Sequence, residues 1–212
     1  MYCRRFILTA SAVVLFTIKT APAASAIPAI NVFVYSFPGL SPAVLHGAET
    51  EAEHILRPVR VKLAWVDCTT AAVPLSCLSP QFPRDLVVRF LPKALSQATA
   101  SALGISGSSE DYATAFLFYD RMLALRNEQR SILAIAGRVL AHELTHLLLP
   151  HEDHTDIGLM RGQWSTMDLE MTSAACCGLS ARSAELMRRD VLRRTRATAA
   201  TARSRDIMLS EP

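Results

Sequence analysis

The sequence predicts an α+β domain, in which a mixed, mostly antiparallel sheet of four strands is covered by helices. The chain has 212 residues and 50% of them are hydrophobic, so it can bury a sizeable core. Stretches typical of strands dominate its first half, and apolar residues recur at helical spacing mainly in its second half. Strands that are interrupted by one early helix and followed by further helices are typical of this fold class.

The four predicted strands are short stretches rich in β-branched and aromatic residues. Two of the four are followed by a proline, Pro38 and Pro92, which cannot easily continue a strand. In an enzyme with a cleft, the fourth would be the edge strand against which an extended peptide could bind. The strands are expected at residues 31–37, 60–67, 85–91 and 113–119.

Three helices are predicted from apolar periodicity. Ser41 is a suitable N-cap for the first helix, and the proline that follows it suits the first helical position. The segment between the third and fourth strands could hold a helical turn or two before a Gly/Ser loop at residues 104–111. The helices are expected at residues 42–56, 131–149 and 181–195.

The first 26 residues have the organisation of a secretory signal peptide. Arg4 and Arg5 precede an apolar stretch from Phe6 to Ile18, and Ala24-Ser25-Ala26 fits an A-x-A cleavage site. The apolar stretch is shorter than the roughly 20 residues that a spanning helix needs. We therefore expect a secreted or periplasmic protein that is cut after Ala26, with Ala21-Pro22-Ala23 as a competing site.

The mature chain is expected to consist of one domain at residues 27–198 and a disordered, basic tail at 199–212. Of the 22 basic residues, Arg4, Arg5 and Lys19 lie in the leader, so 19 remain against 19 acidic residues. A net charge near zero gives no reason to expect a nucleic-acid partner.

Four cysteines remain after removal of the leader, which is typical of disulfide bonding in a secreted protein. We favour a bond between Cys68 and Cys77, which would close a short loop. Cys176 and Cys177 are adjacent, and a bridge between neighbours is strained. They could form a vicinal pair, remain free thiols, or pair with the first two.

The stretch around which the chain is organised is His142-Glu143-Leu144-Thr145-His146, an H-E-x-x-H motif on the second predicted helix. Its two histidines lie on one helix face, about 6 Å apart along the axis, and can take two corners of one zinc tetrahedron. Glu143 can then act as general base on a zinc-activated water. A catalytic zinc usually needs a third protein ligand, for which we prefer His154, with His151 as the alternative. Carboxylate options are Glu152, Asp153 and Asp156.

The stretch from His142 to Trp164 resembles the signature of the metzincin clan of zinc peptidases, H-E-x-x-H-x-x-G-x-x-H followed by a methionine turn. It departs from that signature at Leu149 and Glu152. It is more similar to secreted bacterial metzincin-like proteins of the acidobacterial type, with H-E-x-x-H-x7-H-x3-G-[IL]-M. Their similarity covers about residues 30–195, although this chain has Thr145 and Pro150 where they have glycine.

This resemblance implies a metzincin-like fold with a long active-site helix, a Met-turn and a C-terminal helix. It also implies one catalytic zinc ion on His142, His146 and His154, with Glu143 as general base and Met160 in the Met-turn. The expected function is that of a secreted, monomeric zinc endopeptidase that acts on peptides or proteins and has no stable membrane insertion. The alternatives are a non-proteolytic zinc-binding module and a zinc amidase of another substrate.

Overall fold

The computed structural model describes residues 27–69, 73–127, 131–149, 154–164, 168 and 178–209, the last twelve of them as backbone. The predicted signal peptide, the alternative ligand His151 and the pair Cys176 and Cys177 lie outside the described residues. Within the described part, no helix is both long and apolar enough to cross a membrane.

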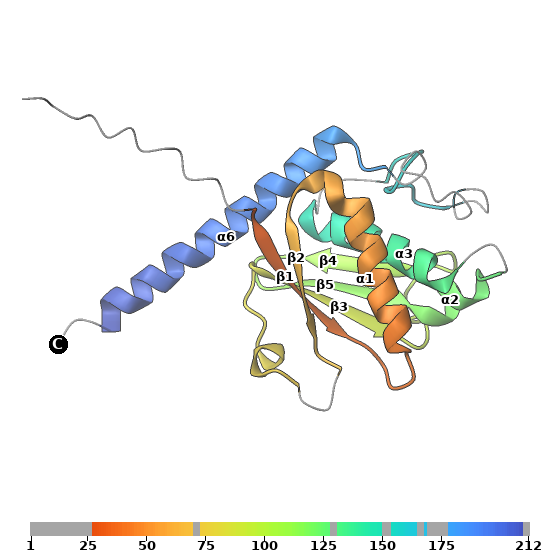
Figure 1. Cartoon of the computed structure of the whole chain (residues 1–212), viewed down its shortest axis with the longest axis horizontal. Helices are drawn as coiled ribbons and strands as arrows, with labels where there is room; N and C mark the ends of the chain where they lie inside the picture. Colours follow the sequence, from red (N-terminus) through yellow and green to blue (C-terminus); the bar gives the residue numbers. More distant parts are fainter. Residues whose placement is uncertain are drawn as a thin grey trace, which may run out of the picture.

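A five-stranded sheet forms the centre of the fold, in the order β2-β1-β3-β5-β4 (Figure 1). Strands β2, β1, β3 and β5 run parallel to one another, and β4 runs antiparallel to β5 at one edge. The strands are β1 (Ala29–Tyr35), β2 (Lys62–Asp67), β3 (Asp85–Leu91), β4 (Gly104–Ser108) and β5 (Ala113–Phe118).

The prediction of four mostly antiparallel strands was therefore wrong in both the number and the direction of the strands. Direction is set by the connections, and the helix between β1 and β2 returns the chain so that both strands run the same way. A signal was present in β3, whose Leu86-Val87-Val88 is buried on both faces, as is typical of parallel sheets.

The additional strand β4 is the segment that the sequence predicted as a Gly/Ser loop. Its sequence, Gly-Ile-Ser-Gly-Ser, lacks the enrichment in β-branched and aromatic residues that marks a strand. It is extended because it pairs with β5 along its whole length, from Gly104 opposite Leu117 to Ser108 opposite Ala113. Strand β4, and not β5 as predicted, is thus the edge strand on this side of the sheet, and β2 is the edge strand on the other side.

Helices α1 (Pro42–Leu56) and α3 (Ile132–Leu148) pack side by side against one face of the sheet (Figure 1). Both begin where a serine caps them: the Ser41 hydroxyl accepts from the Ala43 amide at 3.3 Å, and Ser131 from Leu133 at 3.2 Å. Their bounds agree with the prediction to within one residue. The main core between helices and sheet includes Val32, Val34, Ala48, Ala52, Leu86, Val88, Ala136, Leu140 and Leu144.

Shorter helices complete the described fold. Helix α2 (Tyr119–Ala124) follows β5 directly, and the 3-10 helices η1 (Arg57–Val59) and η2 (Leu75–Leu78) lie in the connections on either side of β2.

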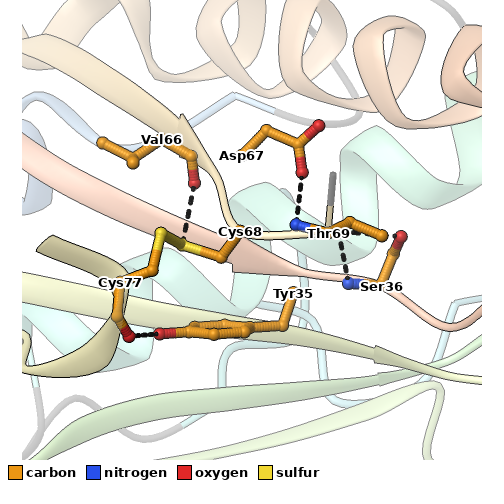
Figure 2. The surroundings of a disulfide bond; sticks show 7 residues. All are labelled: Tyr35, Ser36, Val66, Asp67, Cys68, Thr69 and Cys77. Carbon is orange, nitrogen blue, oxygen red and sulfur yellow. Dashed lines mark hydrogen bonds between the residues drawn. A yellow bond between two sulfur atoms is a disulfide. The ribbon is translucent and has the colours of Figure 1, made fainter. Parts of the chain in front are cut away.

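The opposite face of the sheet carries a small second core that contains a disulfide (Figure 2). Cys68 and Cys77 are bonded, with a Cα–Cα distance of 5.8 Å, and they pack with Phe33 and Val87. The Tyr35 hydroxyl donates to the Cys77 carbonyl at 2.5 Å. The pairing that the sequence favoured is the one that the structure contains, and it holds the segment before β3 against the sheet.

The C-terminal helix α6 (Ala181–Leu209) continues well past its predicted end and projects beyond the rest of the domain (Figure 1). The expected disordered tail is therefore helical as far as Leu209. Arg194 anchors this helix, because its guanidinium is buried and donates to the Pro83 carbonyl at 2.8 Å and the Leu147 carbonyl at 2.9 Å. It also pairs with Asp190. The Leu147 carbonyl lies in the last turn of α3, where no intrahelical donor remains.

We expect Arg194→Ala to lower the free energy of unfolding by about 2–4 kcal/mol, because buried acceptors and Asp190 would lose their charged partner. The matched control is Arg193→Ala, which removes an arginine paired with the same Asp190 but with a side chain that is 65% exposed. The control should change stability by less than about 1 kcal/mol. Urea unfolding followed by tryptophan fluorescence measures both, and equal losses would contradict the anchoring role.

Candidate metal centre

The last turns of α3 carry two imidazoles and one carboxyl group that are buried or half-buried. His142 is 8% exposed and Glu143 is 4% exposed, whereas His146, one helical turn further on, is only half-buried. Apolar neighbours such as Leu140 and Leu144 hold this part of the helix against the sheet. The helix therefore presents the two imidazoles and the carboxylate as a rigid set.

His154 joins the two helix histidines from the loop beyond α3. The Nε2 atom of His146 lies 3.1 Å from the Nε2 atom of His142 and 3.2 Å from that of His154. Two nitrogen ligands on one tetrahedral zinc ion, each at 2.0–2.1 Å, stand about 3.3 Å apart. These two distances match the spacing of ligands on a shared zinc ion. The ligand atoms of all three histidines lie within 4.8 Å of one another, so the three side chains together could hold a metal ion.

The loop that carries His154 also fixes the ring of His142. The Nδ1 atom of His142 lies 2.8 Å from the Leu159 carbonyl oxygen, which can only accept. Nδ1 must therefore carry the proton, and Nε2 is left with a free lone pair directed at the other histidines. A bond from the Thr155 amide to the Met160 carbonyl closes the loop at 2.8 Å, and Gly158 takes a positive φ of 77° within it.

Burial keeps the helix histidines neutral. It lowers the pKa of His142 to about 4, opposed by the hydrogen bond to Leu159 and reinforced by the nearby His146 and His154. Burial, reinforced by His154, likewise lowers the pKa of His146 to about 4. Neutral imidazoles are the form that binds a metal, so these two residues are ready to act as ligands at neutral pH.

The carboxyl of Glu143 is held in a different environment on the same turn. Burial raises its pKa to about 7, and a hydrogen bond with the Ser106 side chain opposes this rise. A carboxyl with a pKa in this range can accept and release a proton near neutral pH, which is what a general base requires.

The histidines and Glu143 line an open cleft of about 890 Å³ beside the sheet edge. One wall is β4 with the segment before it, and the other is formed by α3 and residues 161–164. Trp164 stands in this second wall, edge-on to the His142 ring with centroids 5.4 Å apart, and it also packs against the main core. Lining residues include Leu103, Gly104, Ser106, Tyr112, Val139 and Trp164.

The structure brings together the residues that the sequence singled out for one site: His142, Glu143, His146 and His154. Met160 is 4% exposed and lies in the loop that approaches His142. Among the carboxylates considered, Glu152 and Asp153 lie outside the described residues, and Asp156 is exposed and outside the cluster. Sequence reasoning missed Gly104 and Ser106, because nothing in a Gly/Ser segment shows which helix it will pack against.

No protein-family model matches the chain, and a comparison with curated proteins finds no match. Among solved structures, the crystal structure of archaemetzincin from Methanopyrus kandleri is similar, with a TM-score of 0.47 and 15% sequence identity. The similarity covers 81% of this chain and 99% of that one. The function proposed below rests on the geometry of the site.

We expect His154→Ala to weaken zinc binding at least about 100-fold, because it removes one of the three proposed zinc ligands. Loss of a residue that only hydrogen-bonds a metal ligand already costs about 10- to 100-fold in affinity. The control is His46→Ala, since His46 lies on α1 with a side chain that is 84% exposed. Competition with a zinc-chelating dye measures both affinities. Unchanged affinity in His154→Ala would assign the third ligand elsewhere.

Proposed function

We propose that this protein is a secreted zinc-dependent endopeptidase, in which His142, His146 and His154 hold one zinc ion and Glu143 is the general base. One observation carries the proposal: the Nε2 atom of His146 lies at the spacing of zinc ligands from both His142 and His154, beside the buried carboxylate of Glu143 on α3. A purely structural zinc site is usually closed by a fourth protein ligand and has no need of such a carboxylate.

Each residue has a defined part in this hydrolysis. When bound, zinc would act as a Lewis acid that polarises a water molecule and the scissile carbonyl. Glu143 takes a proton from the water and delivers it to the leaving amine. His142 contributes orientation as well as a ligand atom, because its bond to the Leu159 carbonyl holds its ring in one tautomer.

The cleft suits a peptide in extended conformation. Strand β4 is the last strand in the sheet order, so one of its edges has no strand partner among the described residues. The same strand lines the cleft beside Glu143. Backbone groups on such an edge can pair with an added strand, which would draw a peptide bond toward the histidines.

The remaining features of the proposal concern where and how the protein acts. The Cys68–Cys77 disulfide is typical of an oxidising compartment, which favours secretion or export to the periplasm through the predicted leader. We further propose that the protein acts as a monomer and shares its origin with the secreted bacterial metzincin-like proteins that its motif resembles.

Two other functions use the same residues. A non-proteolytic zinc-binding module would need the histidines and not Glu143, whereas an amidase would need all four residues but act on another amide. The burial and proton affinity of Glu143 favour catalysis over simple binding. Hydrolysis of a peptide library, compared with that of non-peptide amides, distinguishes the two enzymes.

We expect Glu143→Gln to retain zinc and to lower the rate of casein hydrolysis by about 10²–10⁴-fold, because the amide cannot accept the water's proton. The control is Glu185→Gln on the surface of α6, where the side chain is 49% exposed. Zinc content is measured by mass spectrometry beside the assay. Full activity in Glu143→Gln, or a wild-type protein that binds no zinc, would contradict the proposal.

A further inference from the structure

Strand β4 contacts α3 through alternate residues, because side chains on a strand point in turn to opposite faces. Gly104 and Ser106 lie on the face toward Glu143, and Gly107 lies on the other face, against Tyr112. Glycine weakens a strand and often marks a place where another group comes close to the backbone. The contacts of Gly104 identify that group.

Gly104 leaves the space that the Glu143 side chain occupies. A Cβ atom at this position would lie 2.7 Å from Oε1 and 3.0 Å from Cγ of Glu143. It would also lie 3.0 Å from the Phe116 carbonyl oxygen on β5, so it could not move away from Glu143 by turning toward that strand. The carboxylate is the flexible end of a side chain and would move before the paired strands did.

Ser106 lies two residues after Gly104, on the same face of β4, and lines the cleft together with Glu143. An ionised carboxylate can only accept a hydrogen bond, so the Ser106 hydroxyl is the group on this face that can donate to it. Glu143 is 4% exposed, which leaves little room for water to replace this donor. Gly104 therefore leaves the space in which the carboxylate lies, and Ser106 offers a donor on the same face of the strand.

We infer that Gly104 and Ser106 are positioning residues for Glu143, so that the edge strand holds the general base against the metal site. The catalytic meaning of this inference rests on the proposed function. The placement of the carboxylate does not, because it can be observed without any substrate. Neither residue is a zinc ligand, so their effects should separate from those of the histidines.

The experiment compares Gly104→Ala, Ser106→Ala and Ser106→Thr in the full-length zinc-loaded protein. We expect Gly104→Ala and Ser106→Ala to lower kcat roughly 10- to 100-fold with KM and zinc content little changed, since a misplacement of about 1 Å can cost this much. Ser106→Thr retains the hydroxyl and should recover most of kcat. Crystal structures of the zinc-loaded variants should show the Glu143 carboxylate displaced in Gly104→Ala.

Two control variants show how a change elsewhere in the sheet affects kcat and how a change at the metal site affects zinc binding. Thr114→Ala removes a hydroxyl from β5, outside the cleft, and should leave kcat unchanged. Gly162→Ala should instead weaken zinc binding, because a Cβ there would lie 3.1 Å from Cγ and Nδ1 of His154. The two glycine variants are thus expected to differ, one losing rate and the other losing metal.

Several results would overturn the inference. These are an undisplaced carboxylate in Gly104→Ala, unchanged kcat in Gly104→Ala and Ser106→Ala, loss of zinc together with rate in Gly104→Ala, or failure of Ser106→Thr to recover activity. If the wild-type protein hydrolyses no peptide, the proposed function fails. The crystal structures then still decide whether Gly104 and Ser106 place the carboxylate.

Discussion

Polar groups buried on the last turns of α3 are the constraint on which the rest of the structure depends. His142, Glu143 and Thr145 are at most 8% exposed, and an uncompensated polar group in such a place costs several kcal/mol. The compensation comes from three directions: Thr145 donates to the Ala141 carbonyl at 2.8 Å, His142 donates to the Leu159 carbonyl at 2.8 Å, and the Ser106 side chain lowers the pKa of Glu143 against the effect of burial. The contacts that make burial tolerable are also those that orient the site.

The helix that carries these groups is held at both ends. Ser131 caps its start, and Arg194 of α6 binds a carbonyl of its last turn. Beyond Leu149 the chain leaves the helix and comes back at His154, which reaches the His146 ring nitrogen at 3.2 Å. The helix thus holds two of the three converging histidines, and the returning loop supplies the third. The hydrogen bond from His142 Nδ1 to the Leu159 carbonyl oxygen connects this loop to the helix.

The sheet places this site at its edge rather than at its centre. Central strands such as β3 are covered on both faces and serve the core, whereas β4 is short, rich in glycine and serine, and paired on one side. A strand of this composition is weak on its own. Its composition suits its position, because small residues allow the backbone to approach Glu143 while the free edge remains beside the cleft.

Local patterns identified α1, α3, the start of α6, the disulfide and the four polar residues that converge in the cleft. The reason is that spacing along a helix and the pairing of nearby cysteines depend on short stretches of chain. His142, Glu143 and His146 are neighbours on any helix that includes them. Strand direction, the strand status of β4 and the contact of Gly104 with Glu143 depend on segments far apart in the chain, so no local pattern contains them. The position of the proton on His142 also depends on a distant segment. The Leu159 carbonyl that decides it is a backbone group, so it has no sequence signature. The sequence by itself therefore determined which polar side chains converge, whereas their orientation was decided by the backbone groups that the fold brought beside them.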